Sequence, residues 1–166
     1  MAGFLPLVAH SVKRGADVHA AQEFALRNSA SRGHFEVVKY LVEHGANIHA
    51  FDDEPLLLAA NKGHFDIVRF LMETDKTAQW DKTGFAWAAE AGHLDVVKYM
   101  LEKGIDIHAG NDYALRHASS EGHLPVVKYL VEHGADVHAR NDEASKWAKM
   151  NNHLEVVEYL ESLRRI

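Results

Sequence analysis

The dipeptide Gly-His recurs along this chain at a nearly constant interval, and no other feature restricts the fold as strongly. The histidines of the series, at positions 34, 64, 93, 123 and 153, are 30, 29, 30 and 30 residues apart, the last preceded by Asn instead of Gly. A second marker, His-Ala, recurs between them, except where Gln79-Trp80 takes its place. Repetition at this period predicts a stacked array in which no unit buries its apolar surface alone.

One unit, NDYALRHASSEGHLPVVKYLVEHGADVHA, predicts two helices. The first runs from about Tyr113 to Glu121, with Asn111 or Asp112 placed to cap its exposed N–H groups. The second follows the Gly-His pair, and Gly134 is suited to the left-handed conformation that ends many helices. The apolar stripe of the second helix consists of Leu124, Val126, Val127, Leu130 and Val131.

The segments GHFEVVKYLVEHGANIHA, GHLDVVKYMLEKGIDIHA and GHLPVVKYLVEHGADVHA resemble ankyrin repeats, and the resemblance extends over the whole chain. It implies an all-α solenoid of stacked helix-turn-helix units. The period is about 30 residues here and 33 in the family, and the missing residues fall after His-Ala. We therefore expect shortened β-hairpin fingers with little regular strand. Repeats this short are also similar to ankyrin arrays of giant DNA viruses.

The markers divide the chain into a leading half unit and five units within a single repeat domain, 1–166. Their approximate limits are 1–20, 21–50, 51–79, 80–109, 110–139 and 140–166. The half unit aligns with a second helix and has no first helix before it. We expect a monomer, with self-association through this half unit as a further hypothesis.

Net charge, the length of the apolar runs and the lack of Cys limit the classes of function that the chain can have. The net charge of −6 gives no support to nucleic-acid binding. Apolar runs are far shorter than the ~20 residues that span a bilayer, so no membrane association is expected. Because the chain has no Cys, it has neither disulfides nor a thiolate site. These features fit an intracellular protein located in the cytoplasm, including the cytoplasm of a host cell.

The chain has 13 histidines, but their spacing does not predict a metal site. Marker histidines in one unit are separated by a whole helix, and those in neighbouring units by about 8–10 Å, too far for two ligands of one zinc. Hydrogen bonding in turns is the better explanation, although joint protonation could loosen the stack below pH 6. No catalytic motif is present, so neither enzyme activity nor a cofactor is expected.

The resemblance implies a protein–protein interaction scaffold that binds a protein or peptide through its concave groove. Residues that vary while the repeat frame stays constant are the candidate contacts, and Trp and Arg are the types most enriched in binding hot spots. On the concave face and at the finger tips these candidates are Phe51, Asp52, Lys62, Trp80, Lys82, Trp87, Glu90, Arg116, His117, Glu121, Arg140 and Trp147.

Two alternatives remain open: a structural or engineered array with no natural partner, and a substrate of the ankyrin-directed hydroxylase at His49, His108 and His138. The stretch TDKTAQWDKTG, residues 74–84, interrupts the pattern, because it lacks a residue, the marker histidine and the glycine after the second helix. It predicts a local change in stacking, with Trp80 at a rebuilt finger tip.

Overall fold

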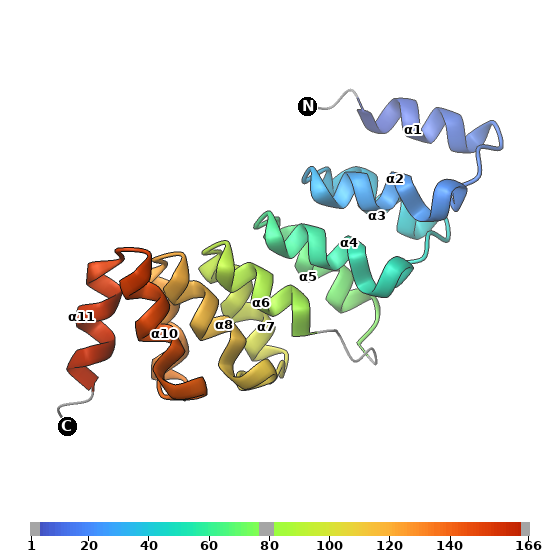
Figure 1. Cartoon of the computed structure of the whole chain (residues 1–166). Coiled ribbons are helices and arrows are strands. Elements are labelled where there is room, and N and C mark those ends of the chain that lie inside the picture. Colours follow the sequence, from blue (N-terminus) through green and yellow to red (C-terminus); the bar gives the residue numbers. More distant parts are fainter. Residues whose placement is uncertain (1–3, 77–81, 164–166) are drawn as a thin grey trace. The chain divides into compact units, whose positions relative to one another are not determined.

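The computed structural model describes residues 4–76 and 82–163, and this part of the chain contains helices and no strand (Figure 1). The helices are α1 (Phe4–Lys13), α2 (Ala20–Ser31), α3 (Phe35–Glu43), α4 (Ala50–Asn61), α5 (Phe65–Thr74), α6 (Lys82–Glu90), α7 (Leu94–Glu102), α8 (Ala109–Ser120), α9 (Leu124–Glu132), α10 (Ala139–Met150) and α11 (Leu154–Ser162). The expected all-α fold is confirmed, and so is the lack of strand within the described residues.

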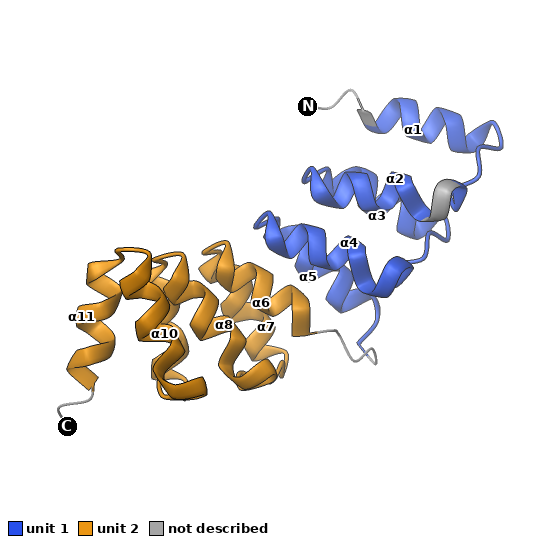
Figure 2. Ribbon diagram, viewed as in Figure 1, with its two compact units in different colours: residues 1–81 blue, residues 82–166 orange. Residues whose placement is uncertain are grey.

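The chain forms two compact units, residues 1–81 and 82–166 (Figure 2). In the first, α2 packs on α4, each pairs with the helix that follows it, and α1 lies against α3. In the second, α6, α8 and α10 form a row of first helices, while α7, α9 and α11 form a row of second helices. The boundary between the units falls in the stretch that interrupts the sequence pattern, of which residues 77–81 lie outside the described part.

The second helices supply much of each core. On α9 the predicted stripe buries Val126, Val127 and Leu130, while Leu124 and Val131 lie at its partly exposed edges. The helical period of 3.6 residues brings the three buried residues to one side, where they pack against the first helix and the neighbouring units. The same three positions are buried on α3 and α11.

The first helices begin in a way that the sequence did not predict. In α8 the residues Gly110, Asn111 and Asp112 have φ values of 65°, 57° and 55°, so the helix is preceded by a left-handed turn. The same turn opens α4 at residues 51–53 and α10 at residues 140–142. The expected capping role of Asn111 or Asp112 is wrong, because these left-handed residues belong to the turn, and the Asp112 carboxylate has other partners.

The second helices that are followed by a glycine end as that glycine predicts. Gly134 has a φ of +100°, and the N–H of Ala135 donates to the carbonyl of Leu130, a bond typical of helices closed by a left-handed residue. At α5 the glycine is absent, and Asp75 is extended, with φ −123° and ψ 95°. The interrupted stretch therefore changes how this helix ends.

Candidate protein-binding surface

The left-handed turns are closed by the histidines of the His-Ala markers. The Nδ1 atom of His108 donates to the carboxylate of Asp112 at 3.0 Å, across the turn. The same bond joins His49 to Asp53 at 2.6 Å and His138 to Asp142 at 2.7 Å. A left-handed residue other than glycine costs about 1–2 kcal/mol, and these bonds offset part of that cost.

The turn carboxylate also joins one repeat to the next. The Asp112 carboxylate, which is almost completely buried, accepts the backbone N–H of Asp136 at 2.8 Å. Glu23 stands at the corresponding position of the first unit and accepts the N–H of Asn47 at 3.0 Å. The marker histidines therefore hold turns by hydrogen bonds, as their spacing predicts.

Arg116 lies beneath the exposed face of α8 and anchors the turn from inside. Its side chain is only 5% exposed. Its Nε donates to the carbonyl of Asn111 at 3.0 Å and one terminal nitrogen to that of Gly110 at 2.9 Å, while the other pairs with Glu143 of the next repeat. The charge is thus neutralised within the interface between α8 and α10.

Three rings above Arg116 form what we call the aromatic cluster, consisting of Tyr113, His117 and Trp147. The His117 ring stacks on that of Tyr113 with centroids 3.8 Å apart, and meets Trp147 edge-on at 5.2 Å. The Arg116 guanidinium lies 5.4 Å from the centroids of both the Tyr113 and the Trp147 rings. Aromatic pairing and cation–π contacts hold the three rings in a defined arrangement.

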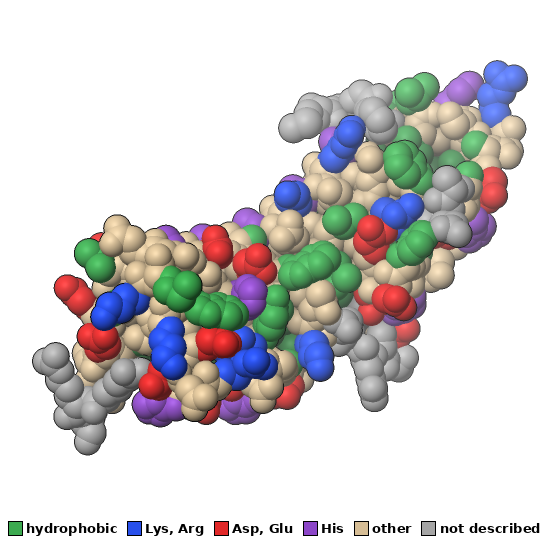
Figure 3. Space-filling view, in the orientation of Figure 1, with side chains coloured by type: hydrophobic (Ala, Val, Ile, Leu, Met, Phe, Trp, Pro, Cys, Tyr) green, Lys and Arg blue, Asp and Glu red, His purple; other side chains and the backbone are tan. Residues whose placement is uncertain are grey.

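Glu90 of α6 borders the cluster, with a carboxylate oxygen 3.4 Å from His117 Nδ1. Burial lowers the pKa of His117 below its usual 6.5, outweighing the opposite effect of Glu90. His117 is therefore neutral at pH 7, and a neutral imidazole both donates and accepts hydrogen bonds. The face over α6, α8 and α10 carries apolar side chains together with acidic, basic and histidine side chains (Figure 3).

The predicted contact residues fall into several environments. Glu90, His117 and Trp147 come together in the second unit, where Trp87 is partly exposed, and Lys82, Glu121 and Arg140 are exposed. In the first unit Phe51 is 52% exposed, with the Arg27 guanidinium 4.5 Å from its ring centroid, and Asp52 and Lys62 are exposed. Arg116 is buried and supports the surface from below, and Trp80 lies outside the described residues.

Two residues outside the list of candidate contacts belong to the same face. Tyr113 completes the aromatic cluster, and Met150, at the end of α10, is 80% exposed. Met150 lines a shallow depression with Ser120, Trp147 and Asn151. The i,i+4 spacing of Tyr113 and His117 on one helix was the signal that could have identified the first of these.

The histidines of the Gly-His pairs have a packing role. A Cβ atom on Gly33 would lie 2.7 Å from the ring of His64, whose Nε2 is 3.1 Å from the carbonyl oxygen of Ser31. The His64 ring thus covers the glycine of the preceding repeat, and the same contact joins Gly92 to His123 and Gly122 to His153. Among the described residues no three His, Asp or Glu side chains gather as a metal site would require.

A family model for ankyrin repeats, in three copies, matches residues 1–83, 26–111 and 85–163. The chain belongs to the ankyrin repeat family. No curated protein matches its sequence significantly. Ankyrin repeats generally mediate protein–protein interactions, and ankyrin repeat proteins are typically scaffolds without enzymatic activity.

The helices of these ankyrin repeats were compared with what a membrane span requires. Within residues 4–76 and 82–163, every helix is too short or too polar to cross a bilayer.

Proposed function

We propose that this ankyrin array binds a protein or peptide segment through the face of α6, α8 and α10. The observation that carries the proposal is the aromatic cluster, whose three rings are partly exposed and two of whose rings, those of Tyr113 and Trp147, lie over the buried Arg116. Hot spots favour large aromatic residues that are rigid before binding, because little side-chain entropy is then lost.

The polar groups around the cluster fit peptide recognition. His117 is neutral at pH 7, and Glu90 beside it offers carboxylate oxygens to backbone or side-chain donors. Met150 adds an adaptable apolar side chain at one end of the face, suited to varied contact shapes. These features support recognition by shape and hydrogen bonding, without bond chemistry.

The proposal is tested by selecting displayed 12-residue random peptides on the wild-type protein and measuring the affinity of the recovered peptides. Trp147→Ala should weaken binding by about 30-fold, corresponding to a hot spot of about 2 kcal/mol, and His117→Ala by about fivefold. The control is His133→Ala on α9, because the His133 and Tyr129 rings form a similar i,i+4 pair on the row of second helices, with centroids 3.9 Å apart and the rings tilted by 32°.

Affinities that are equal for wild type, Trp147→Ala and His117→Ala would refute this assignment. The same selection addresses the competing hypothesis of an array without a natural partner. Such an array should yield peptides that bind at scattered positions on both rows of helices. His133→Ala should then weaken peptide binding as much as His117→Ala does.

A further inference from the structure

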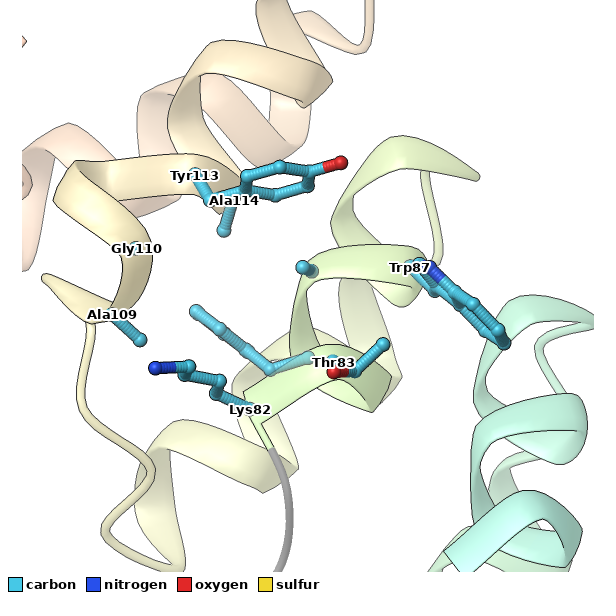
Figure 4. Close-up of a pocket in the computed structure, with 9 residues that line it drawn as sticks. Lys82, Thr83, Trp87, Ala109, Gly110, Tyr113 and Ala114 are labelled. Carbon is cyan, nitrogen blue, oxygen red and sulfur yellow. The ribbon is translucent and has the colours of Figure 1, made fainter. Parts of the chain in front are cut away.

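A cavity of about 260 Å³ lies between α6 and α8, beside the aromatic cluster and within the second unit (Figure 4). Its lining combines a largely apolar wall with a single charged side chain. The lining residues are Lys82, Thr83, Phe85, Ala86, Trp87, Ala109, Gly110, Tyr113 and Ala114.

The repeat register explains why the cavity exists. Ala86 stands 30 residues before Arg116 and occupies the same position of its unit, and Tyr113 likewise stands in the place of Glu143. One repeat later, between α8 and α10, the Arg116 side chain fills the corresponding space and pairs with Glu143. At the α6–α8 step the methyl group of Ala86 leaves that space empty.

The wall of the cavity suits a bulky apolar side chain. Phe85 and Ala114 are 1% and 2% exposed, so their carbon atoms form a fixed floor. The cavity exceeds the ~150 Å³ that accommodates benzene in a protein interior. Its lining contains no carboxylate, so a cationic side chain would find no partner of the kind that Arg116 finds in Glu143.

The only charge in this lining, Lys82, is exposed and forms no ion pair with any residue in the described ranges 4–76 and 82–163. In the close-up its side chain extends toward Ala109, along one edge of the cavity, while the indole of Trp87 points away from it (Figure 4). An ammonium group at the edge repels cations and attracts carboxylates.

We propose that this cavity holds a phenylalanine or leucine side chain of a partner peptide, and that Lys82 pairs with an aspartate or glutamate next to that residue. The inference rests on the proposed function and deepens it, because it names the sequence feature that the partner carries. The Phe or Leu side chain of the partner occupies the space where the array lacks its own arginine. The carboxylate next to it forms an ion pair with Lys82.

The test uses three short synthetic peptides and amide chemical shifts of the wild-type protein. Acetyl-Glu-Phe-Gly-amide should bind with a dissociation constant on the order of 1 mM and shift the amides around Ala86 and Ala114. Replacing Phe by Ala should weaken binding at least tenfold, since the buried apolar surface is lost. Replacing Glu by Gln should weaken it about two- to fivefold, and Lys82→Ala should abolish this difference.

The decisive variant is Ala86→Leu, which fills the cavity with the residue that the array itself carries at this position in Leu57. It should eliminate the shifts, whereas the control Ala25→Leu, at an exposed position of α2, should leave them unchanged. Shifts that are absent in the wild type, or that persist in Ala86→Leu, would overturn the assignment of the cavity. Equal binding of the Glu and Gln peptides would overturn the role of Lys82.

Failure here is distinguishable from failure of the proposed function. Binding in the cavity is tested with short peptides and the Ala86→Leu variant. The proposed function is tested with selected peptides and the His117 and Trp147 variants. If the cavity binds none of the short peptides, the selection of displayed peptides still tests the proposed function.

Discussion

The buried pair of Arg116 and Glu143 provides the sharpest prediction for the stability of the array. The side chains are 5% and 23% exposed, so both charges are largely removed from water. The array carries a different, uncharged pair of residues at the same two positions, because Leu57 and Thr83 occupy the positions of Arg116 and Glu143 two repeats earlier. The perturbation is therefore a double-mutant cycle of Arg116→Leu, Glu143→Thr and the combination of both.

The expected magnitudes follow from the contacts. Glu143→Thr leaves a buried guanidinium without its carboxylate and should cost about 3 kcal/mol, the lower end for a broken buried pair, since Glu143 is partly solvated. Arg116→Leu frees the carbonyls of Gly110 and Asn111 but gains apolar burial, for a net cost of about 1–2 kcal/mol. The double variant should cost about 1–2 kcal/mol, because neither charge remains unpaired.

The assay is urea unfolding of the four proteins, followed by circular dichroism, with amide hydrogen exchange of residues 110–112 as a local readout of the turn. The coupling energy should be about 2–3 kcal/mol, near the upper end for residues in direct contact. If the double variant loses as much stability as the sum of the single variants, the pair does not act as a unit. A loss below about 0.5 kcal/mol in Glu143→Thr, the range of surface substitutions, would show that the guanidinium does not depend on its partner.

Two further predictions concern the turns. Gly122→Ala should destabilise the protein by at least 1 kcal/mol more than Gly134→Ala. Both glycines have positive φ, but the new Cβ atom overlaps the His153 ring in the first and meets nothing within 4 Å in the second. Equal unfolding midpoints would contradict this difference. The hydrogen bond and charge of Glu23 raise the pKa of His19 above 6.5, so this contact contributes stability that is fully present below pH 6.5 and lost as pH rises through the folded-state pKa. Glu23→Gln should bring the pKa of His19 back toward 6.5 in an NMR titration, and an unshifted His19 in the wild type would disprove the contact.

Much of the fold could be predicted from the sequence, because it depends on local patterns. The period of the Gly-His marker indicated the stacked units, and the spacing of Val126, Val127 and Leu130 indicated the buried side of a second helix. Gly134 marked the end of that helix, since a left-handed residue is easiest for glycine.

The candidate surface could be predicted less completely. Glu90, His117 and Trp147 were identified as variable positions, and the structure brings them together. Arg116 was also selected, but an arginine in a sequence gives no sign of the carboxylate that permits its burial. Tyr113 was not selected, because its i,i+4 spacing from His117 places the two rings near each other but does not by itself show that they stack.

The sequence by itself determined the period of the repeat, the helical character of its units and the apolar residues of their cores, since periodicity is a local property of the chain. Only the tertiary structure decided which groups stabilise the turns. Asp112 reads as a helix cap, yet its carboxylate bonds to His108 and to the N–H of Asp136, which lies 24 residues later. Stacking of the repeats brings these atoms together. The same stacking leaves a cavity beside Ala86, whereas one repeat later the Arg116 side chain fills the corresponding space.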